Sequence, residues 1–267
     1  KDFGNRDPKS SFLTEIASTI GVLEHAIKNV DKWAKDEKRP SNVDRPFFIR
    51  MLMGLLGSKS YIKYQPLGTV GVISPWNFPV NLILAPLGGI FAAGNRAMIK
   101  PSELTPATSE VTKKMFEAYF DKSEAAVFTG DAEVGAAFSA LPFDHLLFTG
   151  GTQIGKKVMK AASDNLVPVT LELGGKSPVI VDEDANLSEV AKKVMRGKTM
   201  NAGQICLAPD YLMLPKGRSK EFADASNAAV SEMFADLKYN EDYTSVINER
   251  HYERINELVS DAKEKGA

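Results

Sequence analysis

The chain has 267 residues, of which 43% are hydrophobic and 25% are charged, a composition that allows a sizeable core and excludes a disordered or collagen-like protein. Its 33 Lys and Arg residues nearly balance its 34 Asp and Glu residues, and a net charge of −1 provides no field that attracts nucleic acid or an anionic membrane. A single cysteine excludes an intrachain disulfide, and with three scattered histidines it predicts no metal cluster. We therefore expect a cytoplasmic protein whose partner is a small molecule, with no metal, no nucleic acid and no membrane.

Residues 1–63 are predicted to form an N-terminal helical segment and a linker. Within residues 11–33, apolar side chains recur at helical spacing, at Phe12, Leu13, Ile16, Ile20, Leu23, Ile27 and Val30. The polar run of residues 35–42 that follows is typical of a linker.

Residues 64–173 alternate between short β-rich runs and helical runs. The expected strands are residues 69–73, 96–100, 125–128, 145–148 and 169–173, and the helices between them are residues 82–93, 106–120, 133–141 and 153–162. Such a series predicts an α/β domain with a parallel, Rossmann-like sheet that carries helices on both faces and binds ligands at the carboxyl ends of its strands.

Residues 174–267 are predicted to begin a second α/β domain. A strand at 178–181 leads to a helix opened by Asn186, with Glu189 three positions later in a capping-box pattern. A strand at 211–214, a helix ending near residue 234 and a helix from residue 248 follow. Because a helix and a glycine at this point would ordinarily lead into another strand, we expect this domain to be incomplete.

The glycine-rich turn at residues 150–157 resembles a phosphate-binding loop. It fits the pattern G-x-x-x-x-G-K-[ST] except that Lys157 stands where a hydroxyl would hold Mg²⁺, which disfavours a P-loop nucleotidase. The pattern G-x-G-x-x-G is absent as well. A tight strand-to-helix turn without a ligand explains these glycines equally well.

Two further candidates are a charged pair and the lone cysteine. Lys100 and Glu103 follow the second strand, where a carboxylate accepts the ribose hydroxyls and favours NAD over NADP; the alternative is a solvated pair that caps the next helix. Cys206 follows the turn-like sequence Asn-Ala-Gly-Gln, which predicts an accessible loop thiol, whereas a lone cysteine is more often a small buried side chain.

Five clusters together resemble the motifs of the aldehyde dehydrogenase superfamily, in the same order. They are residues 75–79 (Pro-Trp-Asn-Phe-Pro), 100–103, 149–155, 171–175 (Leu-Glu-Leu-Gly-Gly) and 201–206 (Asn-Ala-Gly-Gln-Ile-Cys). Glu172 and Cys206 are 34 positions apart, as that family's pattern expects. Within the superfamily, residues 129–177 and the opening residues 2–6 are similar to the coniferyl aldehyde dehydrogenases, and less closely to the enzymes of short fatty and aromatic aldehydes.

The resemblance implies NAD-dependent oxidation of an aldehyde, expected to be an aromatic or hydroxycinnamyl one, through a cysteine thioester; NADP remains a possible cofactor. It assigns Cys206 as the nucleophile, Glu172 as the general base and Asn77 as the oxyanion donor together with the Cys206 N–H. The implied cofactor-binding residues are Trp76, Lys100, Glu103, Gly130, Gly150, Gly151, Gly155 and Leu173.

The chain also departs from the family's pattern. Gly151 stands where the family usually has Ser, and the downstream Glu-x-Phe-Gly-Pro motif that grips the nicotinamide ribose is missing, so the chain resembles the first part of such an enzyme. The main alternative is a non-catalytic binding or structural protein that retains the fold. The family's arm segment matches residues 60–65, so we expect the complete protein to be a homodimer or higher homo-oligomer, and residues 1–267 alone to associate non-specifically without activity.

Overall fold

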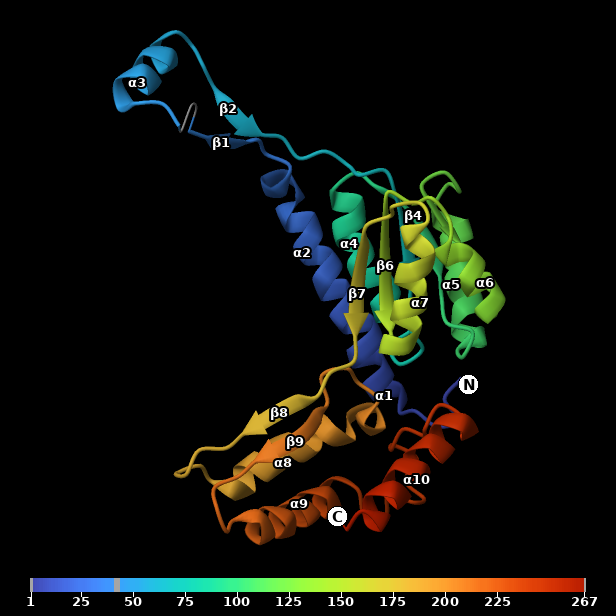
Figure 1. Ribbon diagram of the computed structural model, residues 1–267. Helices are drawn as coiled ribbons and strands as arrows, with labels where there is room; N and C mark the ends of the chain where they lie inside the picture. Colours follow the sequence, from blue (N-terminus) through green and yellow to red (C-terminus); the bar gives the residue numbers. More distant parts are fainter. Residues whose placement is uncertain (1, 41–43, 267) are drawn as a thin grey trace.

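A five-stranded parallel sheet with the order β5-β4-β3-β6-β7 forms the centre of the computed structural model, which describes residues 2–40 and 44–266 (Figure 1). Strands β3 and β4 pair in register from Thr69↔Arg96 to Ile73↔Lys100. The strand bounds are β3 (Thr69–Ile73), β4 (Arg96–Lys100), β5 (Ala125–Val127), β6 (His145–Gly150) and β7 (Val169–Leu173). All five predicted strands are therefore present, within two residues of their expected ends.

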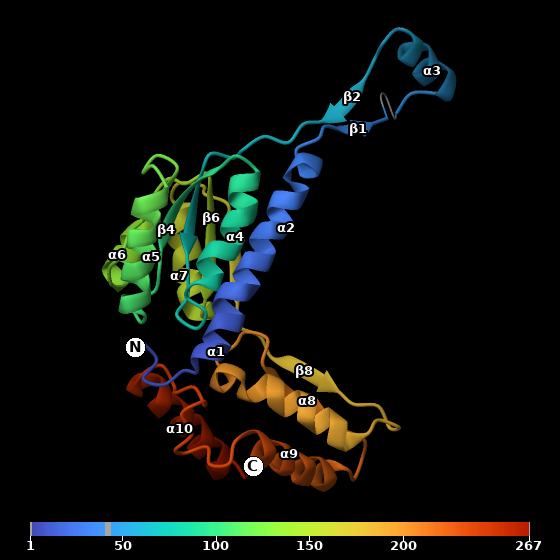
Figure 2. The same cartoon turned by 180° about the vertical axis from the view of Figure 1, so that it is seen from behind.

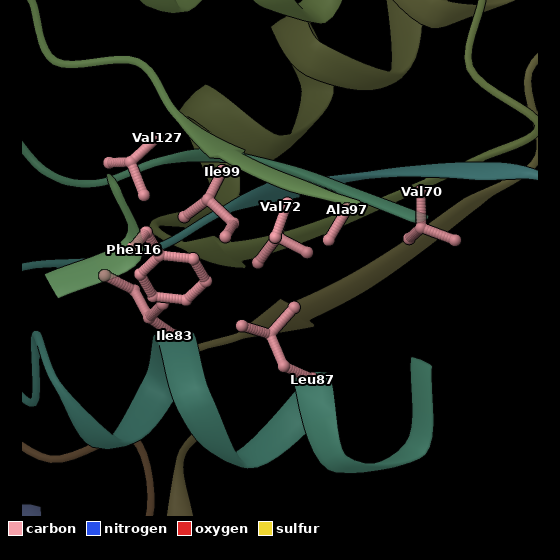
Figure 3. Packing of buried hydrophobic residues seen from close by; sticks show 9 residues of the cluster. Val70, Val72, Ile83, Leu87, Ala97, Ile99, Phe116 and Val127 are labelled. Atoms are coloured by element: carbon pink, nitrogen blue, oxygen red, sulfur yellow. The ribbon is translucent and has the colours of Figure 1, made fainter. Parts of the chain in front are cut away.

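Helices cover both faces of this sheet because alternate strand residues point to opposite sides. Val70, Val72 and Ile99 pack on one face against α4 and α5 (Figure 3). Leu146 and Phe148 pack on the other face against α6 and α7. The four connecting helices are α4 (Asn81–Ala92), α5 (Pro106–Tyr119), α6 (Ala132–Ser139) and α7 (Thr152–Ser163). The predicted α/β class and parallel sheet are confirmed.

The strand order fixes where a ligand site belongs. The chain runs outward through β3, β4 and β5 and then returns to place β6 on the other side of β3. In an open parallel sheet, ligands bind at the carboxyl ends of the strands where the order reverses, which is here between β3 and β6. Residues 75–79 follow β3 and Gly150 ends β6, so two of the motifs lie at this switch point.

The N-terminal helix runs beside α4, and most of its apolar side chains are not the ones that it buries. It comprises α1 (Pro8–Ser11), a π-helical turn η1 (Phe12–Ala17) and α2 (Ser18–Trp33) (Figures 1 and 2). The two helices lie so close that a Cβ on Gly88 of α4 would come within 3.4 Å of Ala26 Cβ. The buried side chains on this helix are Glu15, Thr19 and Ala26, whereas the apolar positions Phe12, Leu13, Ile16, Ile20 and Ile27 are exposed.

Residues 37–40 and 44–62 belong to a projecting arm, of which the sequence analysis expected only residues 60–65 (Figure 1). Strand β1 (Glu37–Arg39) pairs antiparallel with β2 (Ser60–Ile62), and α3 (Phe47–Leu55) lies between them. The linker prediction for residues 35–42 was therefore wrong at β1, because strand pairing depends on a partner more than 20 residues away; residues 41–43 lie outside the described part.

The remaining elements follow β7. Strands β8 (Ser177–Ile180) and β9 (Pro209–Met213) pair in parallel, and Leu187, Ala191 and Phe222 form a small buried cluster beside them. The helices are α8 (Leu187–Thr199), a 3₁₀ turn η2 (Met200–Gly203), α9 (Ser219–Met233) and α10 (Glu249–Glu264). Asn186 accepts hydrogen bonds from the N–H groups of Ser188 and Glu189, so the predicted N-cap is confirmed. The division into three domains at residues 63 and 173 stays a prediction, and among the described residues no helix is long and apolar enough to cross a membrane.

Candidate active site

The segment after β3 meets the loop that carries the cysteine. The Asn77 side-chain amide donates a hydrogen bond to the Gln204 carbonyl at 3.0 Å, and the Asn201 amide donates to the Asn77 carbonyl at 3.2 Å. Gln204 lies two residues before Cys206 in the chain. The structure therefore brings two of the sequence-predicted motifs together, although they are more than 120 residues apart.

The cysteine loop has an unusual backbone that its own side chains hold in place. Asn201, Ala202 and Gly203 have φ values of +49°, +54° and +73°, in the left-handed region that costs non-glycine residues of order 1–3 kcal/mol each. Gln204 compensates, because its amide donates to the Asn201 and Ser245 carbonyls at 3.0 and 3.1 Å and accepts from the N–H of Ile247 at 3.0 Å. Gln204 was part of the cysteine motif, but no role was predicted for its side chain. Its position inside a turn-like run was the one feature of the sequence that pointed to it.

Cys206 is exposed, as predicted, and its thiol is free. Its backbone N–H has no hydrogen-bond partner among the described residues, and the second N–H of the Asn77 amide is likewise unpaired within that part of the chain. Two donors near a thiol can stabilise negative charge on an oxygen bound to the carbon that the sulfur attacks.

Glu172 lies in β7 opposite Thr149 of β6, with an exposed carboxylate that makes no hydrogen bond or ion pair to any described residue. The turn that follows β7 approaches the cysteine loop: a Cβ on Gly175 would lie 3.8 Å from the Cys206 carbonyl oxygen. Three residues after Cys206, the chain enters β9, which pairs with β8 from Ser177↔Pro209 onward. The glutamate motif and the cysteine motif are thus neighbours.

The glycine-rich turn leads from β6 into α7. A Cβ on Gly150 would lie 2.6 Å from the Phe148 ring, so packing disfavours any side chain there. A Cβ on Gly155 would lie 3.0 Å from Leu173 Cδ2, a tight contact that a small shift of the leucine would relieve. Gly151 is different, because no described atom lies within 4 Å of its Cβ position and no described side chain caps α7. The N–H groups of the first helical turn remain available to an anion.

The charged pair of Lys100, the last residue of β4, and Glu103 is not the solvated helix cap that was the alternative from the sequence. Lys100 Nζ lies 3.1 Å from Glu103 Oε2, and the lysine side chain is only 3% exposed whereas the glutamate is 45% exposed. The N-terminus of α5 is capped instead by Asp2, whose carboxylate accepts from the N–H groups of Ala107 and Thr108 at 3.0 and 2.9 Å. Burial opposes ionisation of Asp2, but the hydrogen bonds from Thr108 and Ala107 prevail and lower its pKa.

Two other predicted cofactor residues lie at the same end of the sheet. Gly130 follows β5, and a Cβ there would lie 2.5 Å from Val134 Cγ2. The Trp76 ring packs between Phe3 and His251, with ring centroids 6.2 and 5.4 Å away. The Trp76 ring therefore already has two aromatic neighbours in the protein, and its contact with the cofactor stays a prediction.

Comparison with known proteins identifies the family. The sequence pattern of the aldehyde dehydrogenase family matches residues 4–267. The chain is 55% identical over 267 residues to a probable coniferyl aldehyde dehydrogenase of Caulobacter vibrioides, covering 100% of this chain and 54% of that protein. It is 50% identical over 265 residues to a coniferyl aldehyde dehydrogenase of a Pseudomonas species, covering 99% of this chain and 53% of that protein.

Solved structures agree with this assignment. A substrate-bound state of Staphylococcus aureus AldH matches with a TM-score of 0.87 at 39% identity, over 97% of this chain and 54% of that one. A Mycobacterium tuberculosis aldehyde dehydrogenase complexed with NAD+ matches with a TM-score of 0.84 at 26% identity, over 100% of this chain and 53% of that one. The chain spans about half the length of the relatives that it matches.

Proposed function

The chain belongs to the aldehyde dehydrogenase family, and we propose that the protein oxidises an aldehyde to the carboxylic acid with NAD as the hydride acceptor. The hydrogen bond from the Asn77 amide to the Gln204 carbonyl carries this proposal, because it sets an amide donor beside the loop of a free, exposed thiol.

The first step is addition of the thiol sulfur to the aldehyde. The Cys206 thiolate attacks the carbonyl carbon, a carbon–sulfur bond forms, and the carbonyl oxygen becomes an oxyanion. The free N–H of the Asn77 amide and the Cys206 backbone N–H donate to this oxygen, each contributing on the order of 3 kcal/mol to the stability of the transition state.

The second step is collapse of the tetrahedral adduct and hydrolysis. NAD would supply the hydride acceptor at this point. Loss of a hydride from the oxyanion-bearing carbon converts the adduct on Cys206 into a thioester. Glu172 takes a proton from water, the resulting hydroxide attacks the thioester, and the carboxylic acid leaves as the thiolate re-forms. The carboxylate of Glu172 is exposed and has no partner among the described residues, which supports its role as the base.

The residues at the carboxyl end of the sheet suit a dinucleotide. The uncapped first turn of α7 offers N–H groups to a pyrophosphate, with Gly150, Gly151 and Gly155 keeping that turn free of side chains. Lys100 and Glu103 hold the adenosine ribose, and the exposed carboxylate of Glu103 favours NAD because it repels a 2′-phosphate. Gly130, Leu173 and Trp76 complete the proposed border of the cofactor.

For the substrate, we propose an aromatic aldehyde of the hydroxycinnamyl type, such as coniferyl aldehyde. The support is the 45–55% identity to relatives that carry the name coniferyl aldehyde dehydrogenase. The aldehyde must reach Cys206, which is exposed.

We further propose that the protein is a homodimer or a higher homo-oligomer. Helix α3 exposes large apolar side chains, with Phe47 and Leu55 each 78% exposed. Tyr61, Ile62 and Ile27 are also exposed, which extends the apolar surface along the arm and α2. A second copy that covers this surface would remove it from water.

The direct test measures NADH formation by the full-length protein with coniferyl, benzyl and aliphatic aldehydes. We expect turnover with NAD that is fastest with coniferyl aldehyde, and loss of turnover in Cys206→Ala with NAD binding retained. Turnover by Cys206→Ala would contradict the mechanism, and a preference for aliphatic aldehydes would contradict only the substrate class.

A further inference from the structure

A buried ion pair joins the N-terminal segment to the start of the candidate active site. Arg6 Nη1 lies 2.9 Å from Glu15 Oε1, and the two side chains are 9% and 7% exposed. Removing one partner of such a pair leaves a buried charge uncompensated, which strongly destabilises a fold.

The carboxylate of Glu15 also holds the backbone that follows Asn77. Its second oxygen accepts hydrogen bonds from the N–H groups of Val80 and Asn81, at 3.1 and 2.9 Å. Burial raises the pKa of Glu15, while the bonds from Asn81 and Val80 and the charge of Arg6 oppose that shift. Glu15 therefore fixes the entry into α4 three to four residues after Asn77.

The guanidinium of Arg6 holds Asn77 itself. Its Nη1 donates to the Asn77 carbonyl at 3.3 Å, and its Nη2 donates to Thr14 Oγ1 at 3.3 Å. The guanidinium carbon lies 4.7 Å from the ring centroid of Phe3 and 5.2 Å from that of Phe78. Arg6 thus binds the first residue of segment 77–81, and Glu15 binds its last two residues.

Two observations argue that this arrangement serves more than stability. Arg6 Nε is buried without a hydrogen-bond partner among the described residues, a cost that an apolar contact would avoid. Glu15 lies in a π-helical turn, and such turns are rare and occur frequently at functional sites.

We propose that Arg6 and Glu15 are positioning residues, which hold the Asn77 backbone so that its side-chain amide points toward the oxyanion of the adduct on Cys206. This inference rests on the proposed function. Neither residue touches the substrate; both act through Asn77.

A double-mutant cycle in the full-length protein tests the inference. Arg6→Lys keeps the charge but lacks the second guanidinium nitrogen, which donates to Thr14, and the planar group that lies over the Phe3 and Phe78 rings, so it cannot hold its remaining nitrogen in the same fixed position beside Glu15 and the Asn77 carbonyl. We expect it to lower kcat at least tenfold per folded molecule, with NAD affinity unchanged within twofold. Asn77→Ala should lower kcat by about 10²–10³-fold, and the double variant Arg6→Lys/Asn77→Ala should be no slower than Asn77→Ala within about twofold.

Two controls separate positioning from general stability. Arg218→Lys makes the same substitution in a different ion pair, in which Arg218 Nη2 lies 2.8 Å from Glu221 Oε1. Neither residue contacts the segment after β3, so this variant should leave kcat unchanged. Asp2→Asn weakens the cap of α5 and should lower the melting temperature without the effect on kcat. If Arg6→Lys does not fold, Glu15→Gln takes its place, because it keeps the shape and the acceptor for Val80 and Asn81.

The outcomes distinguish failure of the positioning role from failure of the proposed function. If Arg6→Lys lowers kcat by the same factor with and without Asn77, its effect does not pass through Asn77 and the positioning role is overturned. If Asn77→Ala keeps full kcat, the oxyanion role in the proposed function fails first, and the positioning role fails with it.

Discussion

The amide group of Gln204 closes three hydrogen bonds around the cysteine loop while its backbone carbonyl accepts the amide of Asn77 at 3.0 Å. One residue therefore sets both the shape of the loop and its distance from the segment after β3. This relationship makes Asn77 and the loop of Cys206, the proposed oxyanion donor and nucleophile, parts of one structural unit.

Gln204→Met tests that unit, because methionine keeps the length and volume of the side chain but removes its hydrogen bonds. We expect the free energy of unfolding to fall by about 1–3 kcal/mol and kcat to fall, since the strained residues 201–203 lose their support. Urea unfolding and steady-state NADH assays measure the two effects. Gln65→Met changes an exposed glutamine and serves as the control; equal effects of both variants would contradict the role of Gln204.

Gly151 and Gly150 should respond oppositely to serine. Gly151 is the N-cap of α7, with φ −74°, ψ 143° and open space around its Cβ position. Gly151→Ser therefore supplies a capping side chain and should stabilise the fold by about 0.3 kcal/mol. Gly150→Ser brings a Cβ to 2.6 Å from the Phe148 ring and should destabilise it. Thermal unfolding of both variants provides the measurement, and a stabilised Gly150→Ser would show that the turn packs differently.

Much of the fold could be predicted from local patterns, because each sheet strand and each connecting helix carries its own hydrophobic periodicity. The arm could not, since β1 is a charged tripeptide, Glu37–Arg39, that becomes a strand only through pairing with β2. The face of the N-terminal helix that is buried could not be predicted from the sequence either. Its apolar stripe faces outward at Ile20 and Ile27, and the side that packs on α4 carries Glu15 and Thr19.

In the candidate active site, too, only features that are local in the sequence could be predicted. Glu172, Asn77 and Cys206 could be singled out because their motifs are continuous in sequence. The contacts that hold them are not, since Arg6 reaches Asn77 across 71 positions and Asn77 reaches Gln204 across 127. No local pattern distinguishes Arg6 from the many exposed cations of the chain.

Glu103→Gln tests the choice of cofactor. Removing the carboxylate takes away an acceptor for the ribose hydroxyls and the charge that opposes a 2′-phosphate, so kcat/KM should shift from NAD toward NADP. The change also leaves the buried Lys100 without its charged partner, so the melting temperature should fall. Glu133→Gln changes an exposed carboxylate on α6 and is the control. An unchanged NAD/NADP ratio would show that Glu103 does not face the ribose.

His251 should make stability depend on pH. Burial, with the charges of Arg254 and Arg250, lowers its pKa, so the unfolded chain binds a proton before the folded one does. Stability should therefore be fully present above the unfolded pKa of about 6.5 and decline as pH falls through that value toward the lower folded pKa. Melting temperatures between pH 7.5 and 5.5 should fall less in His251→Gln than in the unaltered protein. His25→Gln, at an exposed histidine, serves as the matched control.

The central claim is that Cys206 carries the acyl group that Glu172 helps to release. Mass spectrometry of intact full-length Glu172→Gln, mixed with coniferyl aldehyde and NAD, tests it most directly. The account predicts an adduct that weighs as much as the aldehyde less two hydrogens, located on the peptide that contains Cys206 and formed with one burst of NADH. An adduct on another residue, or continued turnover without any adduct, would contradict it.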